Sequence, residues 1–336
     1  IYPVMKKRDN KLNIGIIGVG NFGEFLIRCY KEIDKAVVKH ICSRNYENVK
    51  KTAQKYKIQK YCTDYRELLK NKEIDIVVIA TPPFLHAKIS TDSINSGKNV
   101  LVEKPLALNM KQADKIKKAL NQNPKTRLKV DYVLRENPVI DKLKQIISSQ
   151  ILGNIQSIRF ENYASDAHLN NKHWFWDKKK SGGICIEHGV HFFDIFRHLT
   201  KNKPQKFISS STKRKINIED QVLSIVKYDK FPGIFFHSFT KPYQIEKTQY
   251  CLCCDKADVI VNGWIPLSME ICGALSNNEI NKLKKILKDN NSRLNIKTQN
   301  IEKKIKGRGN TYKVDKEINI KYELKQNKEQ IYKKAA

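Results

Sequence analysis

The sequence has no apolar run long enough to cross a membrane and no pattern typical of a secretory signal peptide. Most of its eight cysteines are scattered through apolar segments, as small core residues are. The cluster Cys251-Leu252-Cys253-Cys254 lies in a strand-like run, and no second pair of ligands stands nearby. We therefore expect no metal site, and a cytoplasmic protein with reduced thiols.

Acidic residues are also few, at 34 against 64 lysines and arginines, so the formal net charge is +30. An excess of this size is found in proteins that bind nucleic acids or anionic membranes. Here the lysines are spread through nearly every expected helix and loop rather than gathered in one tract. We interpret them as solvated surface charge that secondarily favours anionic substrates, and we expect no specific nucleic-acid partner and no membrane partner.

A glycine motif follows an apolar segment, Leu12–Ile17, and precedes a helix-like stretch, Glu24–Ile33. The motif is Gly18-Val19-Gly20-Asn21-Phe22-Gly23. Gly18 permits a tight turn, Gly20 lets the backbone approach a pyrophosphate, and Gly23 lets the helix pack closely on the strand. The pyrophosphate then lies at the helix N-terminus, so the segment predicts a dinucleotide site.

No acidic residue stands at the end of the next expected strand, Ala36–Cys42, where a carboxylate usually binds the ribose 2′-hydroxyl of NAD. Ser43 and Arg44 occupy that position. A guanidinium binds phosphate through paired charge-assisted hydrogen bonds, so the pattern favours NADP(H), with NAD(H) possible. The alternative is that Arg44 is an ordinary solvated residue.

Strand and helix patterns alternate as far as about Leu134, which predicts a Rossmann-like α/β domain, a doubly wound parallel sheet, over residues 1–134. Beyond it, half-buried strand patterns such as Ile155–Tyr163 and Gln221–Tyr228 predict a C-terminal α+β domain with a large, mainly antiparallel sheet over residues 135–336. We expect a homodimer or homotetramer formed through the exposed sheet face. The segment Leu275–Asn319 has no clear pattern and receives no assignment.

Four segments occur in an order that resembles the Gfo/Idh/MocA family, the group of glucose-fructose oxidoreductase and inositol dehydrogenase. They are Gly18–Gly23, Ala80-Thr81-Pro82-Pro83 with His86, Gly97–Ala107 with its Glu103-Lys104-Pro105, and Ser181–Asp194. The likeness covers roughly residues 12–265. Together with the glycine motif and the strand end at Ser43 and Arg44, it gives the expected cofactor-binding residues, which are Gly18, Gly20, Asn21, Phe22, Gly23, Ser43, Arg44, Thr81, Pro82, His86, Glu103 and Lys104.

Hydride transfer from a carbinol requires removal of the hydroxyl proton, for which a side chain titrating near neutral pH is suited. The resemblance places His191 at this acid/base position. Lys104, at a strand end, would stabilise the developing alkoxide, and the resemblance has it contact substrate and nicotinamide ribose. Glu187 is the third expected catalytic residue, although the family usually has Asp there, which puts the substrate in doubt more than the reaction. The alternatives are a structural His191 and a merely solvated Lys104.

Substrate-binding residues are expected around these positions. Arg135 could bind a carboxylate or phosphate of the substrate, and aromatic faces could stack on a sugar ring, although the tryptophans could equally belong to the core. The expected set is Tyr132, Arg135, Trp174, Trp176, Glu187 and His188.

These observations predict an NAD(P)-dependent oxidoreductase that acts reversibly on a CH-OH group of a sugar, sugar derivative or cyclitol. One alternative on the same fold is an NAD-dependent glycosidase that uses a temporary oxidation to eliminate the glycosidic bond. A second is a noncatalytic dinucleotide sensor, although a sensor has no need for both Lys104 and His191. A third, suggested by charge alone, is a polyanion binder.

Overall fold

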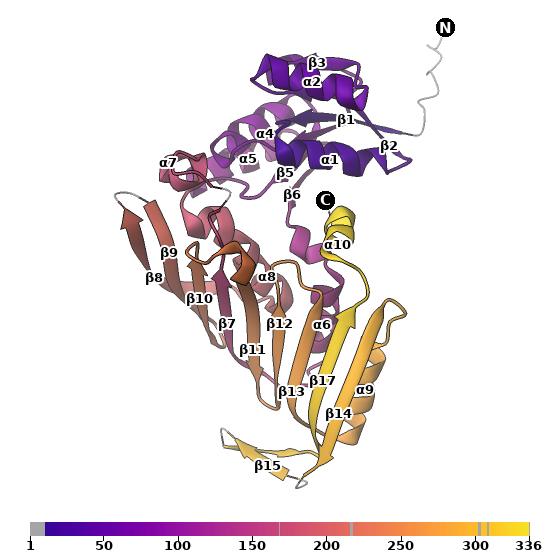
Figure 1. Cartoon of the computed structure of the whole chain (residues 1–336), viewed down its shortest axis with the longest axis vertical. Coiled ribbons are helices and arrows are strands. Elements are labelled where there is room, and N and C mark those ends of the chain that lie inside the picture. Colours follow the sequence, from indigo (N-terminus) through magenta and orange to yellow (C-terminus); the bar gives the residue numbers. More distant parts are fainter. Residues whose placement is uncertain (1–10, 168, 216–217, 302–303, 308, 336) are drawn as a thin grey trace. The chain divides into compact units, whose positions relative to one another are not determined.

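The computed structural model describes residues 11–167, 169–215, 218–301, 304–307 and 309–335. These residues form two compact units (Figure 1). The first contains the residues up to Asp131 together with Lys178–Gly182, and the second contains Tyr132–Asp177 and Gly183–Ala335. The segment Lys178–Gly182 therefore belongs to the first unit, although the rest of that unit's described residues end at Asp131.

The first unit is built on a six-stranded parallel sheet of order β3-β2-β1-β4-β5-β6. The strands are β1 (Leu12–Ile17), β2 (Ala36–Cys42), β3 (Lys60–Cys62), β4 (Ile76–Ile79), β5 (Asn99–Glu103) and β6 (Leu128–Asp131). The central strand β4 buries Val77, Val78 and Ile79, because helices cover both faces of such a sheet. The strand order reverses between β1 and β4, which is where ligands bind in folds of this kind.

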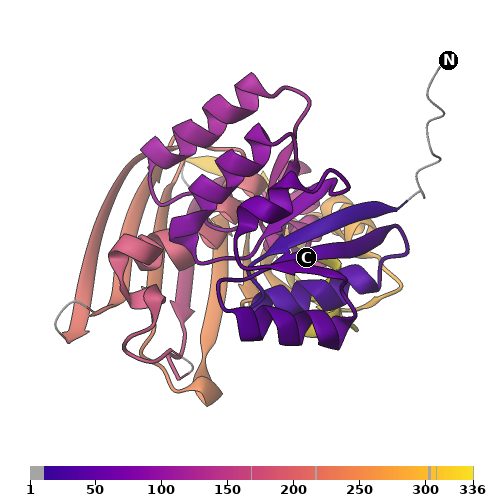
Figure 2. The same ribbon diagram turned by 90° about the horizontal axis from the view of Figure 1, so that it is seen from above.

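Helices lie on both sides of this sheet, as Figure 2 shows, and they form two separate apolar clusters with it. One face is covered by α1 (Asn21–Lys31) and α2 (Tyr46–Tyr56), and the other by α3 (Tyr65–Lys70), α4 (His86–Asn95) and α5 (Met110–Gln122). Side chains of Asn45, Asp64 and Asn109 cap the N-termini of α2, α3 and α5. The predicted doubly wound architecture is confirmed. Two short elements complete the unit, the 3-10 turn η1 (Pro83–Leu85) and the helix α7 (Lys178–Ser181).

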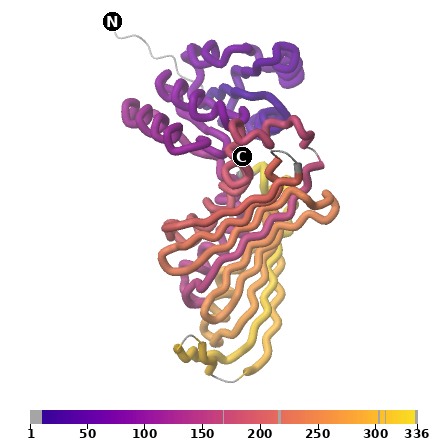
Figure 3. Tube along the Cα trace, turned by 90° about the vertical axis from the view of Figure 1, so that its left-hand side faces the viewer, coloured from indigo at the N-terminus to yellow at the C-terminus, as the bar shows by residue number. Residues whose placement is uncertain are grey.

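The second unit contains a nine-stranded sheet of order β14-β17-β13-β12-β11-β7-β10-β9-β8 (Figure 3). Its strands are β7 (Ile155–Tyr163), β8 (Pro204–Lys215), β9 (Ile218–Tyr228), β10 (Pro232–Ser238), β11 (Lys247–Cys254), β12 (Ala257–Asn262), β13 (Ser268–Leu275), β14 (Ser292–Asn300) and β17 (Lys316–Leu324). The pairing is antiparallel apart from β7 with β10, which run parallel. This confirms the predicted mainly antiparallel sheet. A separate hairpin joins β15 (Lys304–Gly307) to β16 (Asn310–Lys313).

One face of the large sheet packs against three amphipathic helices, α6 (Pro138–Ser148), α8 (Val190–Thr200) and α9 (Asn277–Leu287), around a single core. The remaining helical elements are η2 (Val133–Glu136), η3 (Trp174–Trp176), the π-helical turn η4 (Cys185–Gly189), η5 (Tyr243–Ile245) and α10 (Lys328–Ala335). Strand β9 shows why the sheet has two different faces. Its residues Val222, Ser224 and Val226 are buried, whereas Leu223 and Ile225 are exposed.

The outer face carries a cross-strand row of isoleucines on β8, β9 and β10. Ile208 pairs with Ile225, and Ile225 pairs with Ile234. Their side chains are 75%, 47% and 43% exposed. Assembly into a homodimer or homotetramer through a sheet face stays a prediction.

The segment Leu275–Asn319, which received no assignment, contains α9, β14 and the β15–β16 hairpin and runs into β17. In β14 neither face is buried, so it lacks the period-two alternation by which strands are recognised. Helix α9 does bury Ile280, Leu283 and Leu287, and a capping box formed by Ser276 and Glu279 marks its start. The apolar periodicity and the capping box of α9 could therefore have predicted this helix from the sequence.

Candidate functional site

The glycine turn between β1 and α1 has no room for side chains at two of its three glycines. Gly18 has φ +99°, and a Cβ there would come within 2.5 Å of the Ala80 carbonyl oxygen. A Cβ on Gly23 would overlap the carbonyl oxygen of Gly18. At Gly20, by contrast, an added Cβ would meet nothing within 4 Å. The glycine turn thus has space for a ligand at Gly20 and none at Gly18 or Gly23. Gly20 is the N-cap residue of α1, and the predicted residues Asn21 and Phe22 are the first two residues of that helix.

The backbone of the turn is held by hydrogen bonds from the end of β2 and from helix α2. The Gly18 N–H donates to the Cys42 carbonyl (2.8 Å), and the Asn48 side-chain amide donates to the Val19 carbonyl (3.2 Å). The Ser43 N–H donates to the Cys62 carbonyl (3.2 Å), and Arg44, the residue after it, is exposed. Ser43 and Arg44 therefore lie at the carboxyl end of the sheet, immediately beside the glycine turn.

His86 joins the loops that follow β4 and β5. It is buried, with Nδ1 at 2.7 Å from the Pro105 carbonyl oxygen and Nε2 at 2.7 Å from the Thr81 carbonyl oxygen. Carbonyl oxygens accept and do not donate, so both contacts are hydrogen bonds only when the ring carries two protons. The ring thereby ties the loop of Thr81 and Pro82 to the Lys104–Pro105 peptide bond, which is cis.

Two carboxyl groups meet beside Lys104. Glu103 and Asp131 are paired residues at the ends of the parallel strands β5 and β6. Burial, followed by the neighbouring Asp131 carboxyl, raises the pKa of Glu103 well above its usual range, while Lys104 opposes that shift. Each of two neighbouring carboxyl groups disfavours ionisation of the other, so this pair loses its first proton more readily than its second. Sequence reasoning missed Asp131, because its contact with Glu103 depends on strand register.

In the second unit, three predicted residues lie at the junction of η4 and α8. His191 is buried at the start of α8, and the Trp264 ring meets it edge-on at 5.1 Å between ring centres. Glu187, one turn earlier in η4, is buried too. His188 points into an aromatic group, with ring centres 5.3 Å from Phe192 and 5.2 Å from Phe239.

The remaining predicted substrate residues have contacts within the second unit. Arg135 makes a bidentate ion pair with Asp194, with Nε 2.7 Å from Oδ2 and NH2 2.5 Å from Oδ1, and its guanidinium lies 5.1 Å from the centre of the Tyr132 ring. Trp176 is buried in an apolar cluster with Phe239, and Trp174 packs against that cluster while half-exposed. The interaction with Asp194 occupies one edge of the Arg135 guanidinium.

His237 is a further buried histidine that sequence reasoning missed. It lies on β10, with its ring centre 5.6 Å from that of His188, and burial lowers its pKa to about 3. Both ring nitrogens lack a hydrogen-bond partner among the described residues. The signal available was a lone histidine in an otherwise apolar strand, which does not by itself distinguish a core residue from a site.

We expect His237→Leu to flatten the acid dependence of stability. In the unfolded chain this imidazole takes up a proton below about pH 6.5, whereas in the folded protein it does so near pH 3. Stability from this residue is therefore complete above pH 6.5 and falls by about 1.4 kcal/mol per pH unit as the pH drops toward 3. All three tryptophans belong to this unit, so urea unfolding followed by tryptophan fluorescence at pH 7 and pH 5 measures it. Equal pH dependence of wild type and variant would contradict the assignment.

Comparisons with known proteins agree with this architecture. A family model described as an oxidoreductase family with an NAD-binding Rossmann fold matches residues 12–132, and the GFO/IDH/MocA C-terminal domain matches residues 140–260. The chain belongs to the Gfo/Idh/MocA family. Its two matched regions correspond to the parallel sheet of the first unit and to much of the large sheet of the second.

Curated relatives of this family member match over part of their length. Oxidoreductase P35 of Formosa agariphila is 30% identical over 154 residues, which are 46% of this chain and 48% of that protein. Glucose-fructose oxidoreductase domain-containing protein 2 of Xenopus laevis is 29% identical over 194 residues, 57% of this chain and 50% of that protein. The chain thus spans about half the length of the curated relatives it matches.

Solved structures show the same fold at low identity. A levoglucosan dehydrogenase in complex with NADH and L-sorbose superposes with a TM-score of 0.72 at 20% identity, covering 78% of this chain and 76% of that one. The myo-inositol 2-dehydrogenase of Lactobacillus plantarum gives 0.70 at 19% identity, covering 75% and 76%. Within the described part of this family member, no helix is long and apolar enough to span a membrane, and no group of histidine, cysteine, aspartate and glutamate is arranged to hold a metal ion.

Proposed function

We propose that this protein is an NAD(P)-dependent oxidoreductase that transfers hydride reversibly to or from a CH-OH group of a sugar, sugar derivative or cyclitol. The observation that carries the proposal is the glycine turn, closed to side chains at Gly18 and Gly23 and open at Gly20. Membership of an oxidoreductase family with an NAD-binding Rossmann fold supports it. The sugar or cyclitol substrate is suggested by neighbours described as levoglucosan and myo-inositol dehydrogenases.

The residues around the turn suit a dinucleotide. Gly20, the N-cap residue of α1, has no side chain that could cap the helix. A helix N-terminus without a side-chain cap suits the binding of a pyrophosphate. The half-buried Thr81, whose backbone lies beside Gly18, has a hydroxyl oxygen without a hydrogen-bond partner among the described residues. Buried hydroxyl groups usually have a hydrogen-bond partner, and a ligand bound at the glycine turn would supply one here.

In the proposed reaction the bound nicotinamide supplies the hydride acceptor or donor. His191 takes the proton from the substrate hydroxyl at a ring nitrogen during oxidation and returns it during reduction. The Lys104 ammonium group stabilises the negative charge that develops on the carbinol oxygen. Glu187 accepts a hydrogen bond from another substrate hydroxyl, and Tyr132, Arg135, Trp174, Trp176 and His188 line the substrate site in this proposal.

The preference for NADP(H) over NAD(H) is tested at Arg44. We expect Arg44→Ala to weaken NADPH binding about 10- to 100-fold, because a charge-assisted hydrogen bond contributes about 1.5–3 kcal/mol. NADH binding should change less than about twofold, because NADH has no 2′-phosphate for the guanidinium to bind. Titration of the purified protein, followed by the fluorescence of the reduced cofactor, gives both dissociation constants.

Arg127→Ala is the matched control, since Arg127 is exposed and precedes β6, an edge strand that three other strands separate from β2 and Arg44. It should leave both affinities unchanged. Equal loss of NADPH and NADH binding in Arg44→Ala would contradict the 2′-phosphate role. Absence of saturable binding to either cofactor in the wild type would overturn the proposed function itself.

A further inference from the structure

Two cysteines face each other at the carboxyl end of the parallel sheet in the first unit. Cys42 is the last residue of β2 and Cys62 the last residue of β3, and the two are paired in register. Neighbouring strands lie about 4.8 Å apart, which falls within the range of about 4.4–6.8 Å between Cα atoms that a disulfide requires. Their position in the sheet therefore permits a direct bridge.

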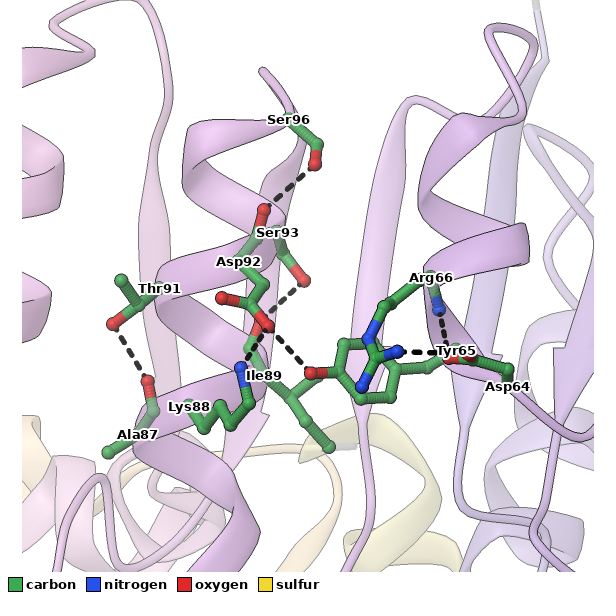
Figure 4. Close-up of polar contacts among 10 residues, drawn as sticks. All are labelled: Asp64, Tyr65, Arg66, Ala87, Lys88, Ile89, Thr91, Asp92, Ser93 and Ser96. Carbon is green, nitrogen blue, oxygen red and sulfur yellow. Dashed lines mark hydrogen bonds and ion pairs between the residues drawn. The ribbon is translucent and has the colours of Figure 1, made fainter.

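The two side chains point to the same face. Both cysteines are buried and belong to one apolar cluster, to which α3 contributes Leu68 and Leu69. Helix α3 is held from its other side by α4, where the Tyr65 hydroxyl donates to Asp92 (2.6 Å) and Lys88 pairs with the same carboxylate (2.9 Å), as Figure 4 shows. Helix α3 thus lies over the two cysteines, so a small oxidant reaches their sulfurs more easily than a bulky one.

The surroundings give the two sulfurs different chemistry. The Cys62 thiol lies 3.9 Å from the Ile41 carbonyl oxygen, to which it can donate. The neighbouring Cys42 thiol, and after it the His40 ring, lower the pKa of Cys62, whereas burial and Glu67 act in the opposite direction. The neighbouring Cys62 thiol, burial and the nearby carboxylates of Asp64 and Glu67 raise the pKa of Cys42. Of the two thiols, Cys62 therefore loses its proton more readily than Cys42. The thiolate is the nucleophilic form.

We propose that Cys42 and Cys62 form an oxidisable dithiol that hydrogen peroxide converts into a disulfide, with Cys62 as the attacking and Cys42 as the resolving cysteine. The Cys62 thiolate attacks one peroxide oxygen, the O–O bond breaks, and Cys62 becomes a sulfenic acid while hydroxide leaves. The hydroxide takes the proton of the Cys42 thiol and becomes water. The Cys42 thiolate then attacks the Cys62 sulfur and releases a second hydroxide. Two electrons pass from the two sulfurs to the peroxide.

The same cysteines hold the dinucleotide turn through their backbones. The Cys42 carbonyl accepts from the Gly18 N–H (2.8 Å), and the Cys62 carbonyl accepts from the Ser43 N–H (3.2 Å). A bridge between the two side chains would therefore join the residues whose carbonyl groups hold Gly18 and Ser43 in place. This part of the inference rests on the proposed function, and it predicts that the disulfide form binds the dinucleotide about fivefold or more weakly.

The first experiment treats the reduced full-length protein with hydrogen peroxide, blocks remaining thiols with an alkylating agent and analyses peptides by mass spectrometry. The expected result is a cross-linked pair of peptides containing Cys42 and Cys62, with six of the eight cysteines alkylated. Dimedone, which traps sulfenic acids, should label Cys62 in Cys42→Ser and should not label Cys42 in Cys62→Ser. Failure of a serine variant to fold leaves the wild-type cross-link as the deciding measurement.

Cys251 and Cys253 provide an internal comparison, because their sulfurs are 3.8 Å apart but both lie on β11. Cys251→Ser should leave the Cys42–Cys62 cross-link unchanged. Oxidation at Cys251 and Cys253 while Cys42 and Cys62 stay reduced would overturn the proposal, as would labelling of Cys42 ahead of Cys62.

The second experiment measures NADPH affinity of the reduced, oxidised and Cys62→Ser proteins, the last also after peroxide treatment. Weaker binding to the oxidised wild type, with peroxide having no effect on Cys62→Ser, would support the link to the dinucleotide turn. Equal affinity of the reduced and oxidised wild type would overturn that link. Absence of binding to the reduced wild type would instead count against the proposed function, and the cross-link would still decide the dithiol.

Discussion

Replacement of His191 with alanine is expected to lower turnover by about 10²- to 10⁴-fold, the usual contribution of a general acid or base. The dissociation constant for the reduced cofactor should stay nearly unchanged. His191 belongs to the second unit, whereas the glycine turn, Ser43 and Arg44 belong to the first. Turnover is measured with a sugar or cyclitol that the wild-type protein oxidises, and cofactor affinity by fluorescence titration.

The control for this substitution lies on the same helix. His198, near the C-terminal end of α8, contacts the Lys144 ammonium group at 3.1 Å and has no proposed role in the reaction. His198→Ala should retain wild-type turnover. A parallel loss of turnover and cofactor affinity in His191→Ala would show a structural role and remove His191 from the mechanism.

Gly23→Ala should abolish measurable dinucleotide binding. The added methyl group would occupy the position of the Gly18 carbonyl oxygen, so either the glycine turn or the start of α1 must move. The obstacle is backbone rather than the end of a flexible side chain, and it lies within the turn proposed to bind the pyrophosphate. Titration with NADPH and NADH, together with the thermal unfolding midpoint, checks both consequences.

Two further alanine variants separate sterics from ligand contact. Gly307→Ala adds a methyl group that meets nothing within 4 Å and should change neither binding nor stability. Gly20→Ala also meets nothing within 4 Å, so the variant should fold normally, yet its methyl group points into the open side of the turn and should weaken dinucleotide binding. Wild-type affinity in Gly23→Ala would mean that the dinucleotide does not use this turn.

The sequence predicts the first unit well because its signals are local. Strand β4 is apolar at every position, and the glycine motif marks where β1 ends and α1 begins. The sequence did not predict the short strand β3, nor the helices α2 and α3 that precede and follow it. In α2 most positions are polar, so its apolar face reduces to residues such as Val49 and Ala53.

The candidate site is less predictable because several of its contacts depend on strand register. The pairs Glu103–Asp131 and Cys42–Cys62 each join residues on adjacent strands that are separated in sequence by a helix or more. Nothing in the local pattern specifies which residue of one strand lies opposite which residue of the next. The motif residues of the first unit, by contrast, are specified by one continuous strand, turn and helix.

The short segment Lys178–Gly182 bears on how such a protein can exchange parts during evolution. It groups with the first unit, where α7 packs near η1, although the chain on both sides of it belongs to the second unit. A single recombination near Asp131 would therefore give a chimera in which the nucleotide-binding unit of one parent carries the α7 segment of the other. Successful natural or laboratory chimeras should carry this segment along with the unit it packs on, or keep the residues by which it contacts that unit.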